Sequence, residues 1–258
     1  MSNVLRSEWI KMRTVRSTTW TLVAMVVVSV GVAAIASAAV SGSWHTMSLG
    51  DKLSFDPTSV SLTGLLFSQL IIGVLGVLVM SAEYGTGTIR STLAAVPNRP
   101  LVLATKAAVL AIVTLVVSEL LSFSAFLLGQ ALLRSPVPHA TLSQPGVLRA
   151  VVGGGLAVTV LGLFGLGLAT VIRHTAGGIS AYVGTLLVLP LINEALPSSI
   201  SHPVGKFLPL NISDTLTSVT HTVGSAPALS PWVGFAVLCG YAIGALVLGG
   251  VLMKRRDA

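Results

Sequence analysis

Six long apolar segments dominate the 258-residue chain, and each is long enough to cross a lipid bilayer as a helix. A helical crossing needs about 20 mostly apolar residues. The six segments are residues 19–40, 60–82, 107–133, 150–172, 176–196 and 231–253. They are continuously apolar, whereas the strands of a membrane barrel alternate in hydrophobicity. We therefore expect an all-α integral membrane protein with six transmembrane helices, because only helices and closed barrels span a bilayer.

The charge content excludes most other classes of protein. Only 9% of the residues are charged, against about 25% in a typical soluble domain. The net charge of +7 does not indicate nucleic-acid binding, because the basic residues lie at the ends of apolar segments, where membrane proteins carry them. The single cysteine, Cys239, cannot form an internal disulfide. We expect one transmembrane domain over residues 1–258.

The distribution of lysine and arginine predicts the orientation. Six crossings place both termini on one side, and positive residues concentrate in cytoplasmic segments. With the termini in the cytoplasm, 11 of the 15 basic residues lie inside and four, Lys52, Arg134, Arg149 and Lys206, lie outside. We therefore expect a multi-pass protein of the cell membrane with cytoplasmic N- and C-termini. The first span, although it contains a cleavage-like Ala36-Ser37-Ala38, is longer than the apolar region of a signal peptide, so we expect it to remain uncleaved.

Residues 1–18 are predicted to form an amphipathic helix in the membrane interface. Leu5, Trp9 and Met12 recur at helical spacing, with most basic residues off that stripe. Glu8 and Lys11 are three residues apart and can pair on the helix surface. The alternative is a positively charged flank that only orients the first span.

Residues 83–100 form the longest predicted cytoplasmic connection. Thr88 is expected to cap a short helix that runs to about Val96 before Pro97 interrupts it. Ile89, Leu93 and Val96 form an apolar stripe along that helix. The stripe can bury against the protein's own spans or against a partner, and spacing does not decide between them.

Few polar groups lie within the spans. A charge in mid-bilayer costs at least about 2.5 kcal/mol, so Glu119 should face the bundle, a partner helix or water. It either lines a translocation path or packs against a polar group such as Gln69 or Ser122. Glu194 lies near the outer end of the fifth span. Gly240 and Gly244 permit a close helix contact, either internal or between subunits.

The chain lacks a recognisable catalytic constellation. No P-loop pattern of spaced glycines followed by Lys-Ser or Lys-Thr occurs, and no nucleophile elbow. The five histidines fall in loops without metal-ligand spacing, so no metal site is expected. We expect that the chain is not an enzyme and does not bind ATP by a P-loop.

Two segments carry a family resemblance. Residues 5–18 (LRSEWIKMRTVRST) and residues 83–90 (EYGTGTIR) with 97–99 (PNR) resemble actinobacterial ATP-binding-cassette (ABC) transporter permeases of the type-2 exporter family. The resemblance implies two copies of a cytoplasmic ATPase subunit, which bind ATP and Mg²⁺, and a second permease subunit, expected to be identical. It further implies that residues 197–230 form an extracellular re-entrant segment.

The resemblance also implies which residues dock the ATPase, with the Ile89 stripe as the coupling surface. These residues are Glu8, Trp9, Lys11, Glu83, Tyr84, Gly85, Thr86, Gly87, Thr88, Ile89, Arg90, Leu93, Val96 and Arg99. The expected function is the transmembrane subunit of an ATP-driven exporter of an apolar or amphipathic substrate. Glu119, Gln69 and Glu194 are the candidates for its path. The alternative is a non-transporting scaffold or sensor subunit that docks an ATPase.

Overall fold

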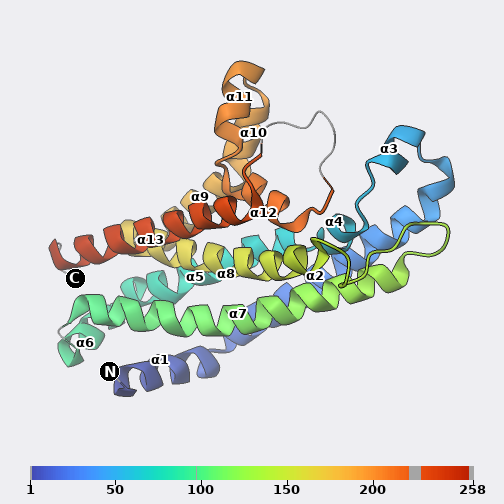
Figure 1. Cartoon of the computed structure of the whole chain (residues 1–258). Helices are drawn as coiled ribbons and strands as arrows, with labels where there is room; N and C mark the ends of the chain where they lie inside the picture. The colour runs from blue at the N-terminus through green and yellow to red at the C-terminus, as the bar shows by residue number, and fades with distance from the viewer. Residues whose placement is uncertain (1, 97, 221–227, 256–258) are drawn as a thin grey trace.

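The computed structural model describes residues 2–96, 98–220 and 228–255 and is built from helices (Figure 1). Six helical spans are long and apolar enough to cross a membrane, which confirms the expected number. They are Arg16–Thr46, Pro57–Gly85, Arg99–Leu132, Val147–Ile172, Thr175–Glu194 and Pro231–Arg255. Most of them extend beyond the apolar segments. The third begins at Arg99 because the side chain of Asn98 accepts the Leu101 N–H at 3.3 Å and caps the helix.

The elements follow one another in a single chain of helices. The long helices are α2 (Arg16–Ser43), α5 (Leu65–Gly85), α7 (Arg99–Leu132), α8 (Val147–Ile172) and α13 (Pro231–Arg255). The fifth span combines α9 (Thr175–Val183), the π-helical turn η2 (Gly184–Val188) and α10 (Leu189–Glu194). The shorter elements are α1 (Ser2–Thr14), η1 (Trp44–Thr46), α3 (Leu49–Leu53), α4 (Pro57–Leu62), α6 (Thr88–Ala95), α11 (Ser198–Gly205) and α12 (Pro209–Thr217).

Helix α8 is the centre of the bundle and packs against α5, α7 and α13. Its most apolar window is 67% buried, the largest share among the six spans. Glycines allow the backbones of α5 and α8 to touch. A Cβ at Gly165 of α8 would overlap the carbonyl of Gly73, and one at Gly76 of α5 would overlap the carbonyl of Gly162. Close backbone approach of this kind is typical of helix packing in membranes.

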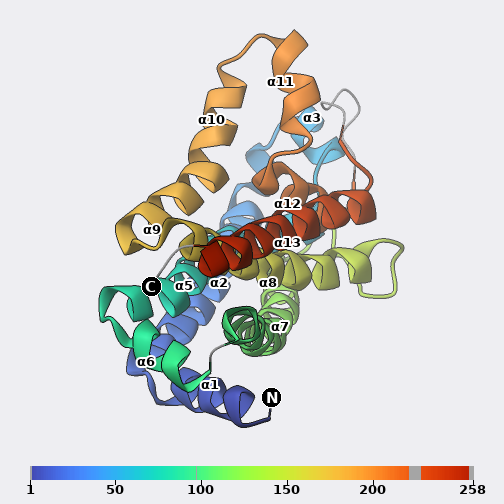
Figure 2. The ribbon, with the colours of Figure 1, turned by 90° about the vertical axis from the view of Figure 1, so that its left-hand side faces the viewer.

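Three spans lie at the periphery. The apolar windows of α13, of α2 and of the α9–α10 span are 17%, 22% and 22% buried. The α9–α10 span leaves the bundle at an angle, and α11 turns back beside α10 toward α12 (Figure 2). Gly240 and Gly244 of α13 have no atom within 4 Å of an added Cβ, so this glycine pair makes no close contact inside the described subunit.

Helices α1 and α6 and the end of α13 lie at the same end of the bundle (Figure 1), called here the α1 end. Two arginines fasten the last turn of α13 there. Arg99 Nη1 donates to the Met253 carbonyl at 2.6 Å, and Arg173 Nη2 donates to the Leu252 carbonyl at 3.1 Å. Helix α3 lies at the opposite end.

The segment 197–230 contains two helices as far as it is described. Pro203 lies inside α11, and α12 packs back on α8 and α13. Asp56 holds the end of this segment, because its Oδ2 accepts the N–H groups of Val219 at 2.6 Å and Thr220 at 3.0 Å. Residues 221–227 of the segment lie outside the described part of the chain.

Candidate functional site

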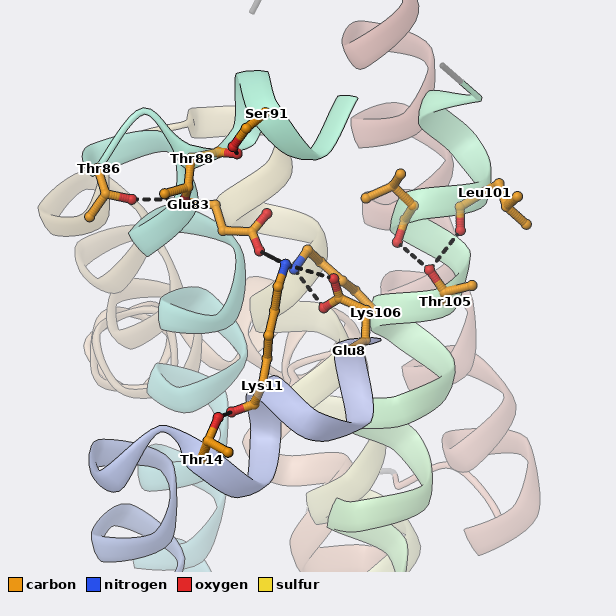
Figure 3. A network of polar contacts seen from close by, with 11 residues as sticks. Glu8, Lys11, Thr14, Glu83, Thr86, Thr88, Ser91, Leu101, Thr105 and Lys106 are labelled. Atoms are coloured by element: carbon orange, nitrogen blue, oxygen red, sulfur yellow. Dashed lines mark hydrogen bonds and ion pairs between the residues drawn. The ribbon is translucent and has the colours of Figure 1, made fainter. Parts of the chain in front are cut away.

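Four charged side chains from three helices meet at the α1 end (Figure 3). Lys106 of α7 donates to Glu8 Oε2 of α1 and to Glu83 Oε1 of α5, both at 2.7 Å. Lys11 of α1 donates to the same Glu83 oxygen at 2.8 Å and to Glu8 Oε1 at 3.0 Å. Glu8, Lys11, Glu83 and Lys106 therefore form a closed ring of alternating charges, called here the charge cluster.

Burial makes the charge cluster a tertiary feature rather than a surface ion pair. The side chains of Lys106 and Glu8 are 1% and 5% exposed, that of Glu83 is 13% exposed and that of Lys11 is 42% exposed. Desolvating such charges is costly unless each is paired and hydrogen-bonded. Here two cations match two carboxylates, so the cluster is electrically neutral.

Lys11 keeps its charge at the edge of the cluster. Burial alone would lower its pKa, but hydrogen bonds to Glu83 and Glu8 outweigh burial and raise the pKa above its ordinary value. Lys11 thus stays an ammonium group at neutral pH. It holds α1 against the end of α5 in that state.

The predicted ion pair between Glu8 and Lys11 is confirmed, but it does not lie on the exposed surface of the helix as expected. The two residues do pair, but Glu8 is buried at 4% exposure and faces Lys106 rather than solvent. Glu8 is therefore not available as a docking contact in this arrangement. Sequence reasoning missed Lys106, which was counted only among the 11 basic residues expected on the cytoplasmic side. The sequence does show acidic and basic residues near the ends of three helices. It does not show which of these helix ends lie next to one another in the fold.

The expected short helix, α6, is confirmed, but Thr88 is not its N-terminal cap as expected. The helix spans Thr88–Ala95 and begins after Gly87, which has a left-handed φ of +72° and contributes no capping side chain. Thr88 lies inside the first turn, and its Oγ1 is 2.9 Å from Thr86 Oγ1. The left-handed turn at Gly87, which glycine adopts without strain, reverses the chain after α5.

The apolar stripe of α6 packs on the protein's own spans. Ile89 is 3% exposed within the main core cluster, and Leu93 packs against the same cluster. Of the two alternatives for this stripe, the structure shows burial against the protein's own spans for Ile89 and Leu93, and its contact with a partner stays a prediction. Burying these side chains removes apolar surface from water and holds α6 in place. Residues Gly85, Thr86, Gly87, Thr88 and Arg90 are exposed beside it.

The remaining expected docking residues are scattered. Trp9 borders an apolar groove with Val23, Val26 and Val113 of the spans, which fits a tryptophan in the membrane interface. Tyr84 lies under the Arg173 guanidinium, whose carbon is 5.3 Å from the ring centroid. Val96 is partly exposed after the end of α6, and Arg99 is bound to α13.

The three candidate path residues lie on different helices, α7, α5 and α10, and have different surroundings. The carboxylate of Glu119 lies against Gly155 of α8, where an added Cβ would be 2.6 Å away, and its buried Oε1 has no hydrogen-bond partner in the described chain. Ser122 donates instead to the Val151 carbonyl at 2.6 Å. Gln69 is 3% exposed on α5, and Glu194 is exposed at the end of α10.

Comparison with known proteins identifies the family. The family model described as ABC-2 family transporter protein matches residues 4–192, which include most of α1, the whole of α6 and the whole charge cluster. The chain belongs to the ABC-2 transporter family. It is therefore a multi-pass membrane protein and the permease component of an ABC system, which associates with an ABC ATPase. No curated protein matches the chain.

Proposed function

We propose that this ABC-2 permease is the transmembrane subunit of an ATP-driven exporter and that the α1 end faces the cytoplasm and docks the ATPase. ATP and Mg²⁺ are bound by two copies of that partner, and a second, identical permease subunit completes the complex. The cargo is apolar or amphipathic. The scarcity of charges within the spans supports this class, because a path for a small hydrophilic ion needs charged or polar groups at membrane depth.

The observation that carries the proposal is the charge cluster. It joins α1, which lies outside the bundle, to the last turns of α5 and the first turns of α7. The chain passes from Glu83 through only a few residues into α6. A displacement of α1 is therefore transmitted directly to two spans through short, charge-assisted hydrogen bonds, and a displacement of α6 reaches Glu83 through the short connecting segment.

The structure changes which residues we assign to docking. Ile89 and Leu93 face the core and hold α6 on the bundle. The exposed turn 85–88 and Arg90 are left to contact the ATPase. Arg90 is the one charged residue of α6, so it offers a salt-dependent contact to an acidic partner surface.

Affinity purification of the tagged permease from its host membranes in mild detergent tests the docking proposal. We expect a stoichiometric subunit that carries a P-loop. Arg90→Glu should weaken this association by about tenfold (about 1.4 kcal/mol) without changing the thermal unfolding of the permease. Arg134→Glu is the matched control, because Arg134 is exposed after the end of α7, away from α6.

Recovery of the permease without an ATPase would overturn the docking proposal. An intact complex whose ATP hydrolysis is unresponsive to every apolar or amphipathic candidate would instead favour the alternative, a scaffold or sensor subunit. Equal loss of the ATPase in Arg90→Glu and Arg134→Glu would contradict the assignment of the α1 end as the docking end.

A further inference from the structure

A partly open cavity of about 540 Å³ lies between α1, α2, α5 and α6, next to the charge cluster. Sites for small molecules usually have volumes of about 300–1,000 Å³. The cavity is bordered by Thr86 and Thr88 of the turn assigned to docking, and it is not lined by the candidate path residues Glu119, Gln69 and Glu194. Its walls have two distinct chemical characters.

One wall is apolar. It is formed by Leu75, Leu78 and Val79 of α5 together with Met12 and Val15 at the end of α1. An apolar body placed against this wall would remove its own surface and that of the wall from water, at about 25 cal/mol per Å².

The opposite wall is the hydroxyl face of α6. Thr88, Ser91 and Thr92 line the cavity and lie three and four residues apart, on one side of the helix. The other side of α6 carries Ile89 and Leu93 into the core. The apolar side of α6 thus packs on the core, and its hydroxyl-bearing side faces the cavity.

Two features make the polar part of the cavity attractive to an anion. The first turn of α6 begins after Gly87 and has no side-chain cap, so its backbone N–H groups and the positive end of the helix dipole are available beside Thr88. Lys11 also lines the cavity, and its ammonium group has three donors, of which the cluster uses two. Glu8 and Glu83 also line the cavity; the two lysines balance their charge, and the buried Oε2 of Glu83 has no hydrogen-bond partner in the described chain.

We propose that this cavity binds a drug-sized amphipathic anion, with its apolar body against α5 and its acidic group between Lys11 and the first turn of α6. Such an occupant contacts both α1 and α6, the two elements that frame the proposed docking end. Its acidic group is a carboxylate, as in a fatty acid, or a phosphate, as in a single-chain phospholipid. Both sources share the chemistry that the cavity recognises.

Photolabelling of the full chain in zwitterionic lipid nanodiscs tests the site without an ATPase. The probe is dodecanoate with a diazirine in its chain, and labelled peptides are mapped by mass spectrometry. We expect labelling within residues 75–92, competed by dodecanoate or dodecyl phosphate and not by dodecanol or dodecyltrimethylammonium. The stronger competitor distinguishes a carboxylate from a phosphate occupant.

Three variants localise the binding. Leu78→Trp fills the cavity and Ser91→Glu places a negative charge in it, so each should reduce labelling by at least about tenfold. Ala95→Glu is the matched control, because Ala95 is exposed on the same helix and does not line the cavity. Competition by dodecanol equal to that by dodecanoate, or labelling unchanged in Leu78→Trp, would overturn the proposal. The result is independent of the docking proposal, since only the permease is present.

Discussion

Lys106 shows how a single side chain determines the architecture of the α1 end. It is the most deeply buried cation among the described residues, and its ammonium group reaches carboxylates on two other helices. Its removal leaves Glu8 and Glu83 with Lys11 alone. Breaking one side of a buried ion pair typically costs about 3–5 kcal/mol, because the remaining charge stays desolvated.

Lys106→Met should therefore destabilise the permease by about 3–5 kcal/mol, measured by unfolding in detergent. Lys11→Met should cost much less, because the Lys11 side chain is 42% exposed and water screens its interactions. The exchanged double variant Glu8→Lys/Lys106→Glu should not recover the loss, because it places two ammonium groups side by side at positions 8 and 11 and two carboxylates side by side at positions 83 and 106. Equal effects of the two lysine variants would contradict the assigned difference in burial.

Single residues also show the limit of sequence-based inference. The pairing of Glu8 with Lys11 was predictable, because three residues separate them on one helix. Their contacts with Glu83 and Lys106 join segments 72 and 98 residues apart. Sequence spacing says nothing about such pairs, because the way the helices pack determines them. The burial of Glu8 could not be predicted for the same reason.

Helix α6 is the element whose role the structure changes most. Its existence followed from the spacing of Ile89, Leu93 and Val96, but an apolar stripe does not say what covers it. In the structure the bundle covers it. The six spans were easier to predict, because continuous apolar length alone specifies them.

Ile89→Asp should therefore act through the fold of α6. A carboxylate in the core without a partner costs several kcal/mol, so we expect both a lower unfolding temperature and loss of the ATPase. Arg90→Glu should lose the ATPase with an unchanged unfolding temperature. Limited proteolysis around residues 85–96 separates the two, since only Ile89→Asp should expose this segment. Retained stability in Ile89→Asp would show that α6 does not depend on this packing.

The α5–α8 contact allows a prediction with an internal control. Gly165→Ala places a methyl group on the carbonyl of Gly73, which forces two backbones apart and should cost about 1–3 kcal/mol. Gly244→Ala meets no atom within 4 Å inside the subunit and should leave the unfolding of the isolated subunit unchanged. Unfolding of both variants in detergent measures the difference. Equal costs would contradict the close approach of α5 and α8.

On the scale of the whole molecule, the exporter and scaffold hypotheses differ at Glu119. The residue sits between α7 and α8, with its carboxylate against Gly155 and no hydrogen-bond partner for the buried Oε1 in the described chain. Because this carboxylate oxygen has no partner, the negative charge of Glu119 adds little to the stability of the contact between α7 and α8.

Glu119→Gln should accordingly leave the fold and the association with the ATPase intact, with a change in unfolding free energy within about 0.5 kcal/mol. The charge is removed while the shape is retained, so a role in the path would appear as a loss of substrate-stimulated ATP hydrolysis and of transport in proteoliposomes. Ser124→Ala is the matched control, since Ser124 is exposed on α7 and its hydroxyl donates only to the Leu120 carbonyl of its own helix. Full transport by Glu119→Gln would remove this carboxylate from the path, whereas loss of assembly would make it a structural residue. The scaffold hypothesis requires that the substitution have no effect on any of these measurements, because a subunit that moves no substrate has no path for Glu119 to line.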